Sequence, residues 1–147
     1  MKKIKFLIIF LYLISLSNFL VANSEISLKD YIQKEDIEKD STQIYLLSRC
    51  SALYTYASAA TLKTDAVSSK NFIETANNLL FKSVELRVID YKEKLETAQK
   101  KASDERKQLF EIYILEGKRN WKLNKSYFKG SYIAEDMSIC TKLVEDK

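Results

Sequence analysis

One long apolar segment dominates the chain after its first 40 residues: residues 41–62, with the sequence STQIYLLSRCSALYTYASAATL. Its apolar side chains recur at alternating spacings of four and three residues, which places them on one face of an α-helix. That face consists of Leu46, Cys50, Leu53, Ala57 and Ala60. Arg49 is the only charged residue in the stretch, and the alanines allow neighbouring helices to approach closely. We therefore predict that residues 41–62 form the central helix of the core.

The rest of the chain also favours helices. Its 147 residues include no proline and only two glycines, so it lacks the residues that strands and tight turns commonly use. Apolar periodicity predicts further helices over residues 70–101, 103–129 and 131–147. The sequence therefore predicts an all-α fold, a small bundle of about four unequal helices in one domain over residues 41–147, pinned by a disulfide that is argued below.

The boundaries between these helices rest on weaker signals. Residues 63–69 read as a connection, and Gly130 and Ser131 suit the end of one helix and the start of the next. Lysines at 100–101 and acids at 104–105 favour a break near Ala102, because cations suit a helix C-terminus and anions an N-terminus. A single continuous helix over residues 70–129 is the alternative.

The N-terminal segment, residues 1–22, has the layout of a secretory signal peptide. Lys2, Lys3 and Lys5 form a positive start, and an apolar run over residues 6–16 leads into a polar stretch over 15–18. We predict cleavage after Ala22 or Ser24. A retained membrane anchor is the alternative, because residues 4–22 are nearly long enough to cross a bilayer. Residues 23–40 are predicted to be a flexible polar lead-in, with at most a short helix over 28–37.

Composition argues against several classes of activity. The chain has no histidine, the commonest general base and metal ligand, and no glycine-rich loop to hold a phosphate. We therefore predict no enzyme activity, no cofactor and no metal. Three of the 24 basic residues lie in the segment 1–22, which holds no acid, so 21 basic and 20 acidic residues remain. The mature chain is nearly neutral, and no nucleic-acid partner is expected.

One group of basic residues is a candidate for binding an anionic surface. Five cations fall within twelve residues that contain no acid, beside Trp121 and Phe128. They are Lys118, Arg119, Lys122, Lys125 and Lys129. Four of them, the lysines, share one stripe of the predicted helix, so contact with a membrane is possible. The alternative is an ordinary solvated helix face whose aromatic residues point into the core.

Arg49 and the two cysteines suggest links between the first and last main helices. Arg49 has no nearby acid on its own helix, so it must reach solvent or a carboxylate elsewhere, and Asp136 is the candidate for an ion pair between helices. Cys50 and Cys140 each lie on an apolar stripe of an exported chain, which predicts a disulfide between them. Two buried free thiols and intermolecular pairing are the alternatives.

Two short motifs give the chain a family resemblance. It resembles small exported bacterial proteins of unknown function that carry an R-C-x-x-L-Y segment on an early apolar helix and a D-x-x-x-C segment near the C-terminus. The matching residues are Arg49, Cys50, Leu53, Tyr54, Asp136 and Cys140. The resemblance implies a disulfide-pinned helical fold in the periplasm or outside the cell, and it implies no activity.

These observations predict an exported, non-catalytic binding or interaction module of the cell envelope. The expected partner is an envelope protein or an anionic surface. The alternative is a membrane-anchored structural protein of the spanin-like kind, with its N-terminal helix retained.

Overall fold

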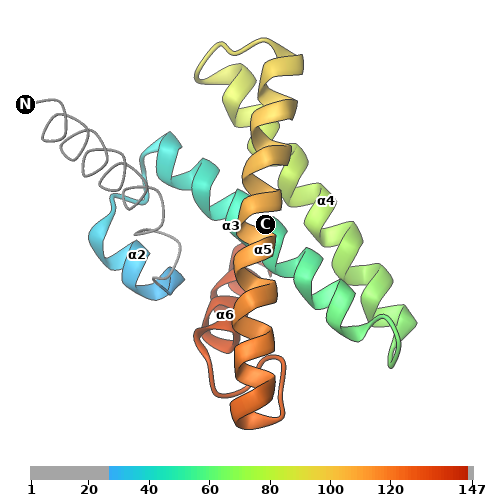
Figure 1. Cartoon of the computed structure of the whole chain (residues 1–147). Helices are drawn as coiled ribbons and strands as arrows, with labels where there is room; N and C mark the ends of the chain where they lie inside the picture. Colours follow the sequence, from blue (N-terminus) through green and yellow to red (C-terminus); the bar gives the residue numbers. More distant parts are fainter. Residues whose placement is uncertain (1–26, 146–147) are drawn as a thin grey trace, which may run out of the picture.

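The structure, a computed structural model, describes residues 27–145 and folds them into five helices (Figure 1). In chain order these are α2 (Leu28–Lys34), α3 (Asp40–Thr61), α4 (Ala66–Ile89), α5 (Leu95–Asn124) and α6 (Tyr132–Glu145). No strand occurs between residues 27 and 145, so the all-α prediction is confirmed for this part of the chain. The prediction of about four helices was slightly wrong, because α2 is a helix in its own right. The predicted signal peptide, residues 1–22, lies outside the described residues.

Helix α3 occupies the centre of the bundle, as its sequence predicts. It contacts α4, α5 and α6, and Cys50, Ala52 and Leu53 are completely buried. Small hydroxyl residues complete its packing surface: the Ser51 hydroxyl donates a 2.7 Å hydrogen bond to the backbone oxygen of Ala76 on α4. Such short side chains let two backbones lie close together while the buried hydroxyl keeps a partner.

The turn between α4 and α5 lies at residues 90–94, and the predicted break near Ala102 is wrong. Ala98 and Ala102 are both completely buried inside α5, where they pack with Val84 of α4. Lys92 adopts a left-handed backbone conformation, with φ of 54°, that helps the chain reverse. The charges that suggested a break at 102 lie on an uninterrupted helix, whose own first turn carries Glu96.

Helix α4 begins earlier than the predicted residue 70. Asp65 caps its N-terminus, because the Asp65 carboxylate accepts a 3.0 Å hydrogen bond from the backbone N–H of Ser68. The short side chain of Asp65 supplies the acceptor that a free helix N-terminus needs. The connection from α3 therefore shortens to residues 62–65.

Helix α5 ends at Asn124, before the predicted end at 129, and Lys125 takes a left-handed conformation with φ of 53°. Asn120 holds the loop that follows, since its amide donates 2.9 Å hydrogen bonds to the backbone oxygens of Ser126 and Lys129. Gly130, expected to cap the helix, lies in this loop with φ of +92°.

Helix α2 packs onto α6, which the sequence did not indicate. Residues 23–40 were predicted to be a flexible lead-in, but Leu28 is completely buried in the core. In addition, Lys29 Nζ lies 3.0 Å from Glu135 Oε1 on α6. Ser27 caps α2 by accepting a hydrogen bond from the backbone N–H of Asp30. No helix in residues 27–145 is both long and apolar enough to cross a membrane.

Candidate functional site

A disulfide joins the middle of α3 to α6. Cys50 and Cys140 are bonded, with Cα atoms 5.4 Å apart, and both residues are completely buried. The predicted disulfide is therefore confirmed. It closes a loop with a sequence separation of 90 residues, which ties the last helix to the centre of the bundle.

Beside the disulfide, the structure brings together Arg49 and Asp136. Arg49 is 1% exposed and Asp136 is 0% exposed, and Arg49 Nη2 lies 2.9 Å from Asp136 Oδ2. Arg49 Nε donates to the hydroxyl of Tyr113 at 3.0 Å, and Nη1 donates to the hydroxyl of Tyr45 at 3.0 Å. Each of the three guanidinium nitrogens therefore has a partner.

Asp136 is held equally well. Its Oδ2 accepts a 2.7 Å hydrogen bond from the Tyr113 hydroxyl, and its Oδ1 accepts a 2.7 Å hydrogen bond from the backbone N–H of Leu28. The network therefore joins α2, α3, α5 and α6. Sequence reasoning missed Tyr113 and Tyr45, because aromatic residues on an apolar face give no signal that their hydroxyls are needed. It missed Leu28 because the donor there is a backbone N–H.

Burial dominates the electrostatics of this network. It raises the pKa of the Asp136 carboxyl above its usual range, although Arg49 and the hydrogen bonds from Tyr113 and Leu28 oppose the shift. Burial also raises the pKa of Tyr113 well above 10.0. None of Arg49, Tyr113 and Asp136 lines a cavity described below, and their polar atoms point at one another. This arrangement is suited to holding helices together rather than to chemistry on a bound molecule.

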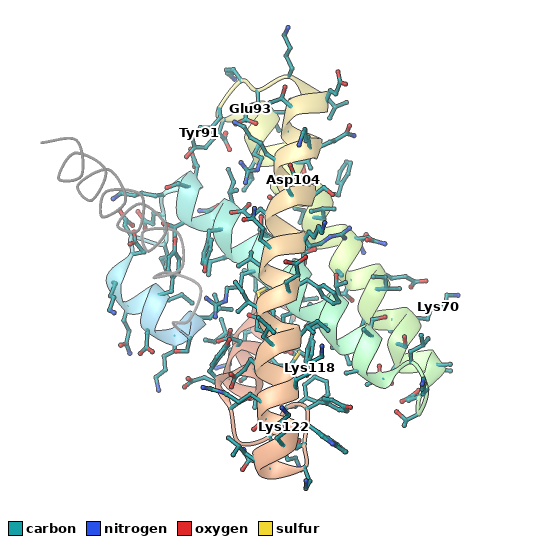
Figure 2. All side chains as sticks on the ribbon, viewed as in Figure 1. Lys70, Tyr91, Glu93, Asp104, Lys118 and Lys122 are labelled. Atoms are coloured by element: carbon teal, nitrogen blue, oxygen red, sulfur yellow. A yellow bond between two sulfur atoms is a disulfide. The ribbon has the colours of Figure 1, made fainter. Side chains whose placement is uncertain are left out.

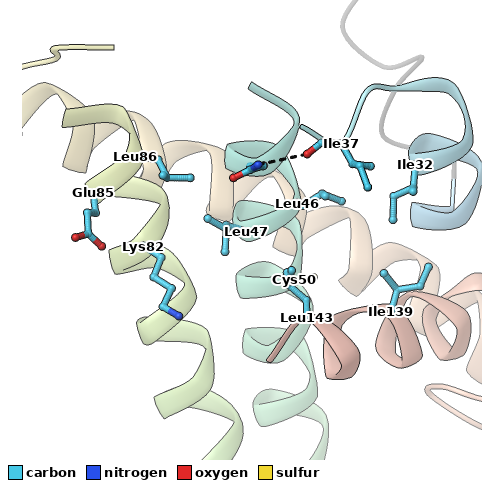
Figure 3. A pocket seen from close by; sticks show the side chains of 11 residues that line it. Ile32, Ile37, Leu46, Leu47, Cys50, Lys82, Glu85, Leu86, Ile139 and Leu143 are labelled. Atoms are coloured by element: carbon cyan, nitrogen blue, oxygen red, sulfur yellow. Dashed lines mark hydrogen bonds between the residues drawn. The ribbon is translucent and has the colours of Figure 1, made fainter. Parts of the chain in front are cut away.

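An apolar groove lies between α2, α3, α4 and α6 (Figure 3). Its volume is about 500 Å³, within the range of roughly 300–1,000 Å³ typical of small-molecule sites. Its apolar walls come from all four helices and from the loop after α2. They include Ile32, Ile37, Leu46, Leu86, Ile139 and Leu143. Cys50, one half of the disulfide, also contributes to the lining.

Two charged residues of α4 lie at this groove. Lys82 is half-buried, whereas Glu85, three residues further on, is exposed. In Figure 3 the Glu85 carboxylate points to the side of α4 away from α3, and the Lys82 amino group lies nearer to the groove. Among residues 27–145, no carboxylate lies within ion-pairing distance of Lys82. The groove therefore offers an apolar interior with the Lys82 cation near its edge, while the Glu85 carboxylate points away from α3.

The predicted anionic-surface residues lie around the C-terminal end of α5, where Figure 2 shows Lys118 and Lys122. All five are exposed, but Arg119 forms an ion pair of 2.8 Å with Glu116. The predicted single stripe is wrong in part: Lys125 and Lys129 fall beyond the end of α5, so only Lys118 and Lys122 share a helical face. The loop brings the remaining two lysines to the same end of the molecule.

A second cavity, of about 460 Å³, adjoins this end. It lies between the end of α3 and α5, and its apolar part is formed by residues that include Ala59, Ala60 and Ile114. Lys63 and Lys118 both line it, and none of the described residues that line it is acidic. Sequence reasoning had not connected Lys63 with the basic residues of α5, because the two lie far apart in the chain.

Comparison with known proteins assigns no family to this fold: no protein family, curated protein or solved structure matches the chain. Within residues 27–145, no group of three or more cysteine, aspartate or glutamate side chains is arranged to hold a metal ion. The function must therefore be argued from the surfaces themselves rather than by analogy with a fold.

Proposed function

We propose that this protein is an exported, non-catalytic binding module of the cell envelope, and that it holds a single acyl chain with an anionic head in the groove between α2, α3, α4 and α6. The observation that carries the proposal is an apolar groove of about 500 Å³ with Lys82 at its edge. A fatty acid has matching chemistry, because it combines one apolar chain with one terminal carboxylate.

A bound ligand would be stabilised by covering apolar side chains of the groove that are exposed to water. Ile37 is exposed and Leu46, Leu86 and Leu143 are only half-buried, so a ligand would remove apolar surface from water at all four positions. That transfer is favourable in proportion to the apolar area buried. Lys82 adds an ionic contact that an uncharged hydrocarbon could not use.

The size of the groove favours a small ligand over a protein partner. Eleven residues of the described chain line it, whereas a stable protein–protein interface uses roughly 20–30 residues on each side. The groove therefore has the dimensions of a small-molecule site, and a protein partner would need additional surface beyond its lining.

Export is supported by the disulfide and by the N-terminal sequence. Disulfides form and persist in oxidising compartments, and residues 1–22 have the composition of a signal peptide. The mass of the protein recovered from the producing cell tests this part of the proposal. Loss of a segment that ends at Ala22 or Ser24 supports export with cleavage, whereas an intact N-terminus supports the anchored alternative.

Binding can be measured with cis-parinaric acid, a fatty acid whose fluorescence rises in an apolar site, and palmitate should displace it. Lys82→Gln should weaken parinarate about tenfold, since one charge-assisted contact is lost. The same change should leave the uncharged methyl ester unaffected. Ile37→Gln should weaken both probes, because it alters the apolar wall.

A matched control is available on the same helix as Lys82. Val67→Gln changes an exposed apolar residue of α4 that does not line the groove, so it should leave binding unchanged. Absence of saturable parinarate binding by the wild-type protein would rule the proposal out, as would binding that is equally strong in Ile37→Gln.

A further inference from the structure

A second surface, which shares no lining residue with the groove, points to a membrane. It consists of the last three turns of α5, the loop at residues 125–131, and Leu62 and Lys63 after α3; we call it the basic–aromatic end. We infer that the basic–aromatic end docks the protein on an anionic lipid bilayer, with Trp121 at the level of the headgroups. This inference is independent of the ligand proposed for the groove.

The exposed charges of the basic–aromatic end are mostly positive. No acidic residue occurs between positions 117 and 134, a segment that carries five basic residues. Arg119 is engaged with Glu116, which leaves four exposed lysines in the segment. Lys63 adds a fifth from the neighbouring connection, since it lines the same cavity as Lys118.

The acids closest to this end in the sequence offset only part of that positive charge. Glu116 is 9% exposed and paired with Arg119, and Glu135 is paired with Lys29. Asp65 accepts hydrogen bonds from the hydroxyl and backbone of Ser68 at the start of α4, and because these lower the pKa of its carboxyl it remains an anion two residues after Lys63. Among residues 27–145, no carboxylate lies within ion-pairing distance of Lys63 or of the four lysines between 118 and 129, so these lysines remain available to anionic headgroups.

Large apolar side chains are exposed at the same end. Leu115 is 67% exposed, Leu123 is 74% exposed, and Trp121 is 43% exposed with its ring stacked on Tyr127 at 4.6 Å. Leu62, beside Lys63, is also exposed. Surface leucines and a stacked tryptophan–tyrosine pair among lysines are typical of segments that lie at a bilayer interface.

The combination favours a bilayer over a nucleic acid. A polyanion in water can use the lysines but gains nothing from the exposed leucines, whereas a bilayer offers anionic headgroups above an apolar layer. The cavity of about 460 Å³ combines the same two features, because Lys63 and Lys118 line it together with apolar side chains.

Trp121 allows a direct test, because it is the only tryptophan in the chain. Wild-type protein should show a blue shift of tryptophan emission with vesicles of equal phosphatidylglycerol and phosphatidylcholine at low salt. It should show none with phosphatidylcholine alone, and the shift should disappear at high salt because the attraction is screened. Lipids brominated just below the headgroup should quench the emission.

Variants identify the responsible residues. Each lysine near an anionic surface contributes about a fivefold increase in partitioning, so the double variant Lys118→Gln with Lys122→Gln should bind roughly 25-fold more weakly. The control carries the same charge change elsewhere on α5: Lys100→Gln with Lys107→Gln should bind like the wild type. Figure 2 shows Asp104, which pairs with Lys100, towards the opposite end of that helix.

Several outcomes would overturn the inference. The inference fails if the wild-type protein does not bind anionic vesicles at low salt. It also fails if binding occurs without any change in tryptophan emission, or if the double variant at 118 and 122 leaves binding intact. Retention on duplex DNA at least as tight as on anionic vesicles, under the same salt, would show that the lysines serve a different kind of partner.

Discussion

Replacing Asp136 by alanine should destabilise the protein far more than an ordinary surface change. The substitution leaves the Arg49 guanidinium, which is 1% exposed, without its carboxylate partner, and it leaves the backbone N–H of Leu28 without an acceptor. Removing one partner of a buried ion pair costs about 3–5 kcal/mol. The total stability of a small domain is roughly 5–15 kcal/mol, so the loss is a large fraction of it.

Replacing both partners at once separates the loss of the ion pair from general loss of packing. Arg49→Met together with Asp136→Leu removes both charges and keeps apolar volume, and such replacements cost far less than breaking a pair. The double variant should therefore unfold at higher urea than Asp136→Ala, although Leu28 still lacks an acceptor. Urea unfolding followed by far-ultraviolet circular dichroism measures each free energy of unfolding.

The exposed pair Lys29 and Glu135 supplies the control. Their side chains are 57% and 43% exposed, and pairs of this kind contribute about 0–1 kcal/mol. Glu135→Ala should therefore shift the urea midpoint only slightly. Our reasoning about Asp136 is refuted if Asp136→Ala costs no more than Glu135→Ala, or if the double variant is less stable than Asp136→Ala alone.

Three further predictions concern stability. Cys50→Ser should lower the free energy of unfolding by roughly 4–5 kcal/mol, the loop-closure entropy for about 90 residues; a melting temperature unchanged from that of the oxidised wild type would contradict this. Gly117→Ala should lower the melting temperature despite the ~1 kcal/mol that alanine gains in a helix, because the new methyl group would collide with the hydroxyl and ring of Tyr56; a rise would contradict it. Burial raises the pKa of Tyr56 and of Tyr132 to about 12, so the folded state keeps protons that the unfolded chain, with a tyrosine pKa of 10.0, has released. Stability should therefore fall as pH rises above about 10, and equal urea midpoints at pH 9 and pH 11 would argue against it.

The central helix and its disulfide could be predicted because their signals are local or few. The apolar periodicity of residues 41–62 needs no knowledge of the rest of the chain, and a chain with two cysteines allows one intramolecular pairing. The pairing of Arg49 with Asp136 could also be predicted from a small number of candidates. A buried cation in an apolar helix requires an anion, and few acids lie on the buried face of a later helix.

The α4–α5 turn could not be predicted because the same order of charges, basic residues followed by acidic ones, occurs at two places in the sequence. Basic residues followed by acids appear near Ala102, but Arg87 and Glu96 give the same order around the real turn. Tertiary packing decides between them: Ala98 and Ala102 are needed on an unbroken helix to let α4 lie against it. Neither glycine nor proline marks the turn, so the sequence contains no independent signal for it.

The membership of α2 in the bundle was missed for a different reason. The most deeply buried of its ties to the core are one side chain, Leu28, and one backbone N–H that donates to Asp136. Backbone donors are the same in every residue other than proline, so no sequence pattern distinguishes this one. A predominantly polar segment with a single anchoring leucine therefore reads as a lead-in until the acceptor on α6 is located.

The spacing of the two links between α3 and α6 explains how the groove keeps its wall. Arg49 and Cys50 are consecutive in α3, and their partners Asp136 and Cys140 are four residues apart, about one turn, on one face of α6. A single link would leave α6 free to pivot about the linked residue. Two links one turn apart along one face of α6 also fix the direction of its axis. Leu143 continues the same face at i+3 after Cys140, so the links also hold its side chain toward the groove that it lines.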